Sequence, residues 1–451
     1  MDSNLSKAVE VAKQRMIVPT VSAVLPDGAL LEMVYQPAQA RSGFAIWKDG
    51  GWKFETAFSV SERKRLVPYS PDNNLLKNEV VLLPSEPQEY DSQQKLMGEI
   101  EAFIHRYVDV GPLVEKIASY YVLLSWIYDA FNELPYLRLR GDTGCGKTRF
   151  LLTVGSLCYK PMFASGASTV SPLFRIIDAF RGTLIVDEAD FRLSDERAEV
   201  VKILNNGNAK GFPVLRTEVS PKREFNPTAY SVFGPKLVAT RGPFEDRALE
   251  SRCLTEEMGQ YHLRDDIPIN LSSHYKLEAL ELRNKLLLFR FRNLQAVQTN
   301  DSLVDRAIEP RLNQVLVPLL SIIEDAGARN DLRELARLYN GQMIADRGMD
   351  NEARVLEVIR DLGASGEAKL SIKEITSWFS DRHQDEYERK ITPKWVGSIV
   401  RKKLNLRTQK SDGVFVIPLE EQPKLARLYE KYGIDNKASI AGAADISPGS
   451  V

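Results

Sequence analysis

One run of eight residues, 141–148, constrains the fold more than any other feature of the chain. It reads G-D-T-G-C-G-K-T and matches the pattern G-x-x-x-x-G-K-[ST], in which glycines let successive backbone N–H groups turn toward phosphate oxygens. The alternating run 136–140 before it is typical of a strand, and 149–154 after it begins a helix. This strand–loop–helix order is the context in which such a loop binds phosphate, whereas a glycine turn before an ordinary helix is the alternative. The sequence therefore predicts a nucleoside triphosphate site.

Each position of this loop has an expected part in nucleotide binding. Lys147 places a positive charge near the β- and γ-phosphate oxygens, and the Thr148 hydroxyl is a ligand for Mg²⁺. The predicted cofactors are therefore ATP and Mg²⁺. The residues that we expect to contact the nucleotide are Gly141, Asp142, Thr143, Gly144, Cys145, Gly146, Lys147 and Thr148.

The composition of the chain limits the classes of protein to which it can belong. At 451 residues the chain is too long to fold around a single hydrophobic core, so we expect more than one domain. Its content of 43% hydrophobic and 27% charged residues is ordinary for a soluble protein. A formal net charge of −1 means that any nucleic-acid-binding surface must be local. The few cysteines and histidines are scattered and predict neither a disulfide framework nor a zinc site. Because no apolar run matches a membrane span or a secretory signal, we expect a cytoplasmic protein without membrane contact.

A second candidate catalytic segment is the apolar run 182–186, which is followed by Asp187 and Glu188. At the end of a strand beside a phosphate loop, Asp187 can hold the Mg²⁺ shell, and Glu188 can act as general base on the attacking water. A buried strand capped by solvated acids is the alternative. The position of these acids, about 40 residues after Lys147, favours the catalytic interpretation.

Two later segments contain candidate contacts to the γ-phosphate. The strand candidate 236–240 ends in Thr240, which could point at the γ-phosphate from a strand between the other two; a turn-forming threonine is the alternative. Arg252, with Arg247 as second choice, lies by the strand candidate 251–254, far along the sheet from the loop. We therefore expect it to act on a neighbouring subunit's nucleotide as an arginine finger, which requires an oligomer. A structural salt bridge is the alternative.

The chain divides into segments of different pattern. Strands alternate with helices through about residue 255, as a parallel sheet covered by helices requires, and 275–295 and 303–325 are expected to be lid helices. A D-G-G hairpin signature at 49–51 marks the first module as β-rich. The predicted boundaries are 1–90 for a β-rich or mixed module, 91–330 for an ATPase core with a helical lid, 331–349 for a helical linker, 350–433 for a C-terminal module and 434–451 for a disordered tail.

The order of these motifs resembles the AAA+ ATPases. Phosphate loop, Asp-Glu strand, polar sensor strand and Ser-Arg segment follow one another between 95 and 325, about half of the chain. The segment 248–253, A-L-E-S-R-C, is similar to the arginine-finger segment of MCM-type helicases. The resemblance implies a phosphate-loop α/β fold, a ring that is typically a hexamer, and Arg311 as a second γ-phosphate sensor on a lid helix. An ordinary helix start at Pro310 is the alternative for Arg311.

A predicted hairpin between the Asp-Glu strand and the sensor strand is the first link to DNA. Its arms are 212–219 and 225–233, and Lys222 and Arg223 lie at its tip. It resembles the hairpin that projects into the central channel of MCM rings, where basic tips can grip single-stranded DNA without sequence preference. A solvated turn is the alternative.

The C-terminal module is the second link. Helices expected at 351–362, 371–380 and 392–404, followed by strands at 404–408 and 414–418, predict a winged helix-turn-helix, with Thr392-Pro393 starting the third helix. Between 391 and 410 it has no acids, so it offers a local surface for DNA phosphates, in duplex DNA for example. A protein-interaction module is the alternative. The basic residues of this surface are Lys394, Arg401, Lys402, Lys403, Arg407 and Lys410.

Taken together, these patterns predict an ATP-hydrolysing, ring-forming DNA helicase or translocase. The chain departs from MCM proteins in lacking a long insertion near 171–180 and zinc ligands in its first module, which indicates a compact relative of the kind carried by mobile elements. The main alternative is an AAA+ loader or switch that acts on a protein partner without unwinding DNA.

Overall fold

The computed structural model divides the chain into two compact units, with the division after Glu334. It describes residues 16–189, 195–219, 225–244, 246–259, 263–348, 350–365, 370–387, 390–411 and 413–434. The predicted boundary at 330 falls inside one helix, α11 (Ala326–Gly348), and the division after Glu334 falls in the same helix. The predicted tail after 434 lies outside the described residues, and the other predicted boundaries stay predictions.

A five-stranded parallel sheet forms the centre of the first unit, so the expected α/β core is confirmed. Its strand order is β14-β8-β13-β10-β9, and every neighbouring pair is parallel. β13 lies between β8 and β10 with all its residues buried, as is typical of a parallel strand covered on both faces. The strands are β8 (Tyr136–Arg140), β9 (Met162–Ser165), β10 (Leu184–Asp187), β13 (Lys236–Thr240) and β14 (Cys253–Glu257).

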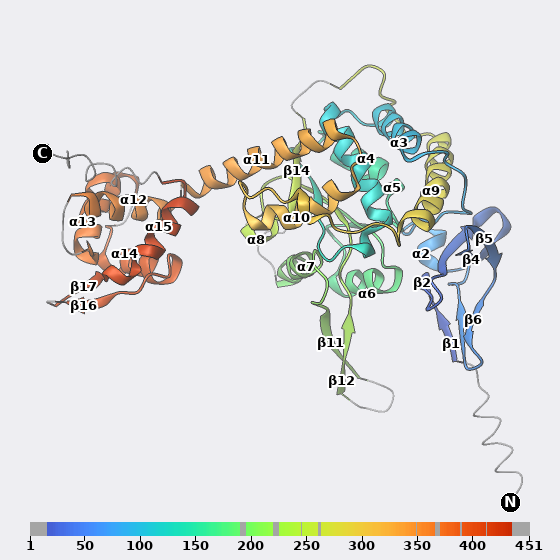
Figure 1. Cartoon of the computed structure of the whole chain (residues 1–451), viewed down its shortest axis with the longest axis horizontal. Coiled ribbons are helices and arrows are strands. Elements are labelled where there is room, and N and C mark those ends of the chain that lie inside the picture. Colours follow the sequence, from blue (N-terminus) through green and yellow to red (C-terminus); the bar gives the residue numbers. More distant parts are fainter. Residues whose placement is uncertain are drawn as a thin grey trace, which may run out of the picture. The chain divides into compact units, whose positions relative to one another are not determined.

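Helices cover both faces of this sheet (Figure 1). α5 packs on β10 and β13, α6 packs on β9, and α4 and α9 pack against α5. α4 is buried at every position from Ile117 to Trp126, as is typical of a helix that is apolar nearly all round. The helices are α3 (Gln93–Tyr107), α4 (Pro112–Trp126), α5 (Lys147–Leu157), α6 (Val170–Phe180), α7 (Asp195–Asn206), α8 (Arg247–Glu250), α9 (Ser273–Asn293) and α10 (Pro310–Ile322). No helix among the described residues is both long and apolar enough to cross a membrane.

The second lid helix is shorter than the sequence pattern predicts. α10 begins at Pro310 instead of 303, since the residues before it form a loop closed by Asn313. The Asn313 side chain accepts a hydrogen bond from the Asp305 N–H (2.8 Å) and donates one to the Asp305 carbonyl (2.7 Å). A side chain that bonds the preceding backbone in this way competes with helix formation there.

Two small sheets form the N-terminal part of the first unit. The D-G-G hairpin is confirmed between β4 and β5, where Asp49 and Gly50 take positive φ values of 51° and 79°. One sheet has the order β2-β3-β4-β5 and the other β1-β7-β6. The elements are β1 (Met16–Pro19), β2 (Ser22–Val24), β3 (Leu30–Gln36), β4 (Arg41–Lys48), β5 (Gly51–Glu55), β6 (Phe58–Ser61), β7 (Lys64–Val67) and α2 (Asn74–Lys77).

These small sheets share their core with the parallel sheet. One apolar cluster runs from Leu31 and Phe44 to Val186. A buried charged cluster also joins them, because Glu32 of β3 lies 2.9 Å from the Lys160 ammonium and 2.7 Å from the Arg290 guanidinium, and each of the three is at most 3% exposed. A buried carboxylate is tolerated where cations and hydrogen bonds compensate its lost hydration. The N-terminal sheets are therefore a fixed part of the first unit.

The predicted hairpin between β10 and β13 is confirmed. β11 (Val214–Val219) and β12 (Phe225–Tyr230) pair antiparallel in full register from Val214↔Tyr230 to Val219↔Phe225. The hairpin extends away from the parallel sheet (Figure 1). Lys222 and Arg223, predicted at its tip, lie outside the described residues.

In its described residues, the second unit contains the end of α11, three further helices, a small sheet and a closing helix. Thr392 caps α14 as predicted, because its side chain accepts a hydrogen bond from the Trp395 N–H (3.3 Å) and Pro393 follows it. The strand expected at 404–408 is wrong: Leu404 and Leu406 fill the core, while Asn405 takes a left-handed φ of 53° that breaks an extended run. The elements are α12 (Asn351–Ala364), β15 (Leu370–Ser371), α13 (Ile372–His383), α14 (Pro393–Ser398), the π-helical turn η5 (Ile399–Lys403), β16 (Gln409–Ser411), β17 (Val414–Ile417) and α15 (Gln422–Lys431).

Candidate nucleotide-binding site

The glycine-rich loop connects β8 to α5 at the carboxyl edge of the parallel sheet. Gly146 directly precedes α5 with a φ of 92°, a left-handed conformation that favours glycine. A Cβ atom at Gly141 would lie 2.6 Å from the Met258 carbonyl oxygen, so only glycine fits there. The conformation therefore depends on the motif glycines and leaves backbone N–H groups at the start of α5, where an anion is favoured.

Lys147 is held inside this loop. Its ammonium group donates to the carbonyl oxygens of Gly141 and Asp142, both at 2.6 Å, and the residue is only 8% exposed. These acceptors are neutral backbone groups, so the positive charge has no carboxylate among its described partners. Phosphate oxygens would be stronger acceptors for the same donor.

Thr148 and Asp187 come together from α5 and β10. The Thr148 hydroxyl donates to Asp187 Oδ2 at 2.6 Å, although the two residues are 39 positions apart. A hydroxyl and a carboxylate side by side are the oxygen ligands that Mg²⁺ takes in proteins while keeping waters and substrate phosphates. The residues present thus fit a nucleotide with its Mg²⁺.

Glu188 follows Asp187 in a strained conformation. Its φ of 54° is unusual for a residue with a side chain, and such strain concentrates at functional sites. Its side chain is 71% exposed and lies 3.6 Å from the Arg241 guanidinium. Sequence reasoning missed Arg241; its only signal is that it directly follows the predicted sensor strand.

Thr240 ends β13 beside the loop. Its residue is 1% exposed, yet its hydroxyl has no hydrogen-bond partner within the described part of the chain. Its carbonyl accepts from the Gly141 N–H at 3.2 Å, and in the sheet it pairs with Arg140. A buried hydroxyl without a protein partner costs free energy unless something else satisfies it, and a γ-phosphate or the attacking water is a suitable acceptor.

Arg252 lies at the opposite, amino edge of the sheet. Its carbonyl accepts from the N–H of Tyr136, the first residue of β8, whereas the loop follows the last residue of β8. At about 3.3 Å per residue, the strand puts the two edges roughly 16 Å apart. Its guanidinium is bound within its own chain, to Asn208 at 2.7 Å, Asn205 at 2.6 Å and the Ala248 carbonyl. The structure does not bring Arg252 to the loop of the same chain.

Arg311 and Arg247 are on the same side as Arg252. Burial and then the positive charge of Arg311 lower the pKa of Arg252. Arg311 also lies close enough to the Glu133 carboxyl to act on its pKa, although burial dominates and raises it. Arg247 begins α8, one turn before Arg252. The amino edge thus carries three candidate arginines.

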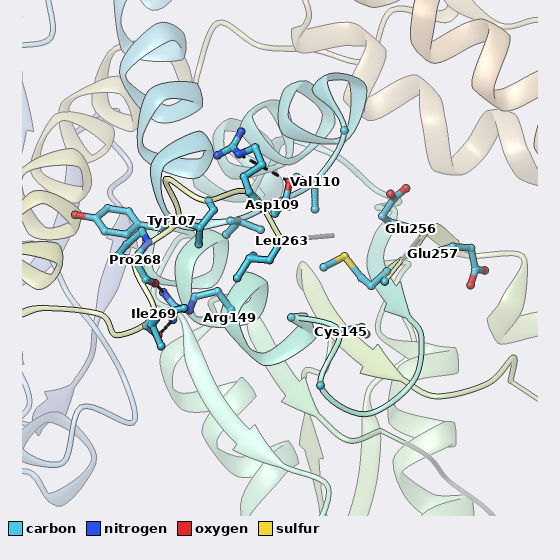
Figure 2. Close-up of a pocket in the computed structure, with 18 residues that line it drawn as sticks. Tyr107, Asp109, Val110, Cys145, Arg149, Glu256, Glu257, Leu263, Pro268 and Ile269 are labelled. Carbon is cyan, nitrogen blue, oxygen red and sulfur yellow. Dashed lines mark hydrogen bonds and ion pairs between the residues drawn. The ribbon is translucent and has the colours of Figure 1, made fainter. Parts of the chain in front are cut away.

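A cavity of about 580 Å³ lies beside the loop (Figure 2). Its walls are the loop residues Gly144 to Gly146, the turn 108–111, the end of β14 with Glu256, and the segment 263–269. Its volume is that of a small-molecule site. Burial, and then the negative charge of Glu257, raise the pKa of Glu256 to about 7. Apart from the loop residues, no motif marks these walls, and sequence reasoning missed the turn 108–111, Glu256 and the segment 263–269.

The predicted basic surface of the second unit is exposed. Arg401 lies 5.7 Å from the ring centroid of Phe415, which is 51% exposed, and Phe415 pairs with Lys410 across β16 and β17. All of the predicted basic residues of this unit are exposed, namely Lys394, Arg401, Lys402, Lys403, Arg407 and Lys410.

No protein-family model and no curated protein sequence matches the chain. Among solved structures it is similar to the C-terminal region of NrS-1, with 10% identity, 86% of this chain and 95% of that chain covered, and a TM-score of 0.35. It is also similar to the SCCmec type IV Cch helicase (11% identity, 94% and 84% covered, TM-score 0.38) and to an MCM homolog from Methanopyrus kandleri (11% identity, 69% and 68% covered, TM-score 0.37). TM-scores this low carry no argument about function.

Proposed function

We propose that the chain is a ring-forming ATPase of the AAA+ type that moves along or unwinds DNA. The observation that carries the proposal is the Thr148–Asp187 hydrogen bond beneath a complete phosphate loop, since it assembles two Mg²⁺ ligands from separate elements. The fold supports it through β13, which separates the loop strand from the Asp-Glu strand and ends in a hydroxyl without a hydrogen-bond partner among the described residues.

In this proposal each residue at the carboxyl edge has a defined task. Loop N–H groups and Lys147 bind the phosphates, and Thr148 and Asp187 hold Mg²⁺, which when bound would neutralise phosphate charge. Glu188 takes a proton from the attacking water, and Thr240 orients that water or the γ-phosphate. The cavity walled by 108–111 and 263–269 receives the base and sugar.

The amino edge is proposed to serve a neighbouring subunit. Because Arg252 lies an entire strand length from its own loop, it can act on a nucleotide only in trans, and Arg311 and Arg247 are further candidates on the same side. Nucleotide then binds between subunits, and we propose a hexameric ring as the assembly.

DNA is proposed to bind at two places. The β11–β12 hairpin, with Lys222 and Arg223 between its strands, would contact single-stranded DNA in the ring. The second unit would bind DNA phosphates, duplex DNA included, as a winged helix, supported by its three helices, small sheet and exposed basic side chains. The short connection from α6 to β10 supports a compact helicase of a mobile element.

The test is the ATPase rate with and without single-stranded DNA over a range of protein concentrations, for wild type and Arg252→Ala. We expect the wild-type rate to rise with DNA and concentration, and the variant to lose about 1,000-fold. Mixing Arg252→Ala with Glu188→Gln should restore activity, because each supplies what the other lacks. Arg63→Ala, at an exposed arginine in a turn, is the matched control.

A rate indifferent to both DNA and concentration would contradict the motor and favour a loader or switch. Charge reversal at Lys222 and Arg223 separates these two functions further. A motor should lose its DNA-stimulated ATPase and unwinding, whereas a loader should keep partner binding.

A further inference from the structure

The end of α7 and the turn that follows it, residues 205–208, hold Arg252 through two asparagine side chains. Arg252 Nε donates to Asn208 Oδ1 at 2.7 Å, and its Nη1 donates to Asn205 Oδ1 at 2.6 Å. The Asn205 amide nitrogen donates to Asp246, which caps α8, so this amide is oriented with its oxygen toward Arg252. The arginine is thus positioned by side chains that come from a separate part of the sequence.

The same turn precedes β11 in the chain and is bonded to the segment that follows β12. Lys236, which is fully buried, donates to the carbonyl oxygens of Gly207 (3.1 Å), Val232 (3.0 Å) and Gly234 (2.9 Å). The Gly234 N–H also donates to the Gly207 carbonyl at 3.1 Å. Gly207 lies between the two asparagines, so the segment that holds Arg252 also contacts the segment that leaves the hairpin after β12.

The bonds from Arg252 to the asparagines can be exchanged for stronger ones. Amide oxygens are neutral acceptors, whereas phosphate oxygens form charge-assisted, often bidentate hydrogen bonds with a guanidinium. Two of the donors, Nε and Nη1, are already used by the asparagines. Nη1 also donates to the Ala248 carbonyl. To present a bidentate fork to a nucleotide on a neighbouring subunit, Arg252 must therefore give up at least one of these three hydrogen bonds, and a fork made by Nε and Nη2 requires it to leave Asn208.

We propose that Asn205 and Asn208 are positioning residues that couple Arg252 to the hairpin. When Arg252 transfers to a neighbour's nucleotide, the turn loses one of its side-chain anchors and keeps the Lys236 bond to Gly207, so the base of β11–β12 can shift; when Arg252 returns, the turn is held at both points again. This inference rests on the proposed function, since it requires a nucleotide in trans and DNA at the hairpin.

The test compares Asn208→Ala, Asn208→Asp and, as the matched control, Asn206→Ala, which changes an exposed asparagine in the same turn. The readouts are the ATPase rate without DNA and the ratio of the rates with and without single-stranded DNA. Alanine removes an anchor, so we expect a basal rate about three- to tenfold higher and a smaller DNA stimulation. Aspartate binds Arg252 more strongly through its charge, so we expect a lower basal rate. Asn206→Ala should behave as wild type.

Opposite effects of alanine and aspartate distinguish positioning from a structural role. If both variants lower the two rates in parallel and leave the stimulation ratio unchanged, the turn merely supports the fold and the coupling is overturned. The amide hydrogen-exchange rate of residues 205–216 is a readout that does not depend on turnover. ATP should raise this rate in the Glu188→Gln protein and leave it unchanged in the double variant Glu188→Gln, Arg252→Ala. An equal rise in both proteins would overturn the coupling. A wild type without DNA stimulation overturns the proposed function itself, before any variant is considered.

Discussion

The two edges of the parallel sheet carry candidate catalytic groups of opposite kinds. At the carboxyl edge, Lys147 is bound to neutral carbonyls and the buried Thr240 hydroxyl has no described partner, so both have capacity left for a ligand. At the amino edge, Arg252 is bound by three groups of its own chain. The carboxyl edge therefore has the properties of a ligand-binding site. At the amino edge, the guanidinium of Arg252 is held by its own chain and would have to be released before it could contact a ligand.

The difference also lies in how the residues reach their places. The carboxyl edge is built from short motifs, and one hydrogen bond between Thr148 and Asp187 joins them. The residues at the amino edge come from segments that are far apart in sequence, and no single motif contains them. Examples are Glu133, Asn205 and Arg311. A site built from a few short motifs depends on the few elements that carry them. A site whose residues come from many separate segments depends on the correct placement of every one of those segments.

Among variants that leave Arg252 in place, the largest expected effect comes from breaking the carboxyl edge alone. Lys147→Ala should lower ATP turnover by at least about 100-fold, because the only loop side chain with a full positive charge is lost. Glu188→Gln should lower turnover comparably yet retain ATP binding, since it removes the base and leaves the loop intact. Equilibrium binding of a fluorescent ATP analogue separates the two. Turnover near the wild-type rate in Lys147→Ala would refute the site.

An intermediate effect is expected where the two edges are joined. Arg138, fully buried in β8, forms a bidentate ion pair with Glu250 of α8, two positions before Arg252. Glu250→Gln leaves that buried cation without a charged partner, so we expect the free energy of unfolding to fall by about 3 kcal/mol in a urea titration. The control is the double variant Arg138→Met, Glu250→Leu, which removes both charges. It should regain most of the free energy of unfolding that Glu250→Gln loses. If the free energy of unfolding of Glu250→Gln equals that of wild type, the Arg138–Glu250 ion pair is not what joins the two edges.

The smallest effect concerns the pH dependence of nucleotide binding. Burial and the charge of Glu257 raise the pKa of Glu256 from 4.5 to about 7, so between these values the folded chain holds a proton that the unfolded chain has lost. The contribution of this group to stability is therefore complete below pH 4.5 and lost as the pH rises to 7. Since the neutral acid does not repel phosphate, ATP should bind more tightly at pH 6 than at pH 8.

Glu256→Gln isolates that effect from the protonation of ATP, which is the same for both proteins. The change in affinity between pH 6 and pH 8 should be about threefold larger for wild type than for the variant, the size expected of one screened charge. Identical pH profiles would place Glu256 away from the bound phosphates and restrict the nucleotide to the rest of the cavity.

Much of the carboxyl edge could be predicted because its residues are close in sequence. The loop, the strand before it and the helix after it follow from glycine, lysine and hydrophobic patterns within the run 136–154, and Thr240 was placed by the alternation of strands and helices. The prediction of a strand at 404–408 was wrong because alternating apolar residues need not form a strand. Leu404 and Leu406 instead pack into the core from an irregular segment. Asn405 between them is left-handed, a conformation that asparagine adopts more readily than most residues, so its identity is a weak local signal against the strand.

The sequence by itself determined the phosphate loop, the Asp-Glu strand, the hairpin and the positions of the basic residues, since each depends on the local chemistry of a few neighbouring residues. Only the tertiary structure decided that Arg252 is bound by Asn205 and Asn208, that Glu32 joins the N-terminal sheets to α9, and that a cavity opens beside the loop. The physical reason is that hydrogen bonds and buried ion pairs require groups within about 3 Å. Chain segments far apart in sequence reach that distance only when the whole core has packed.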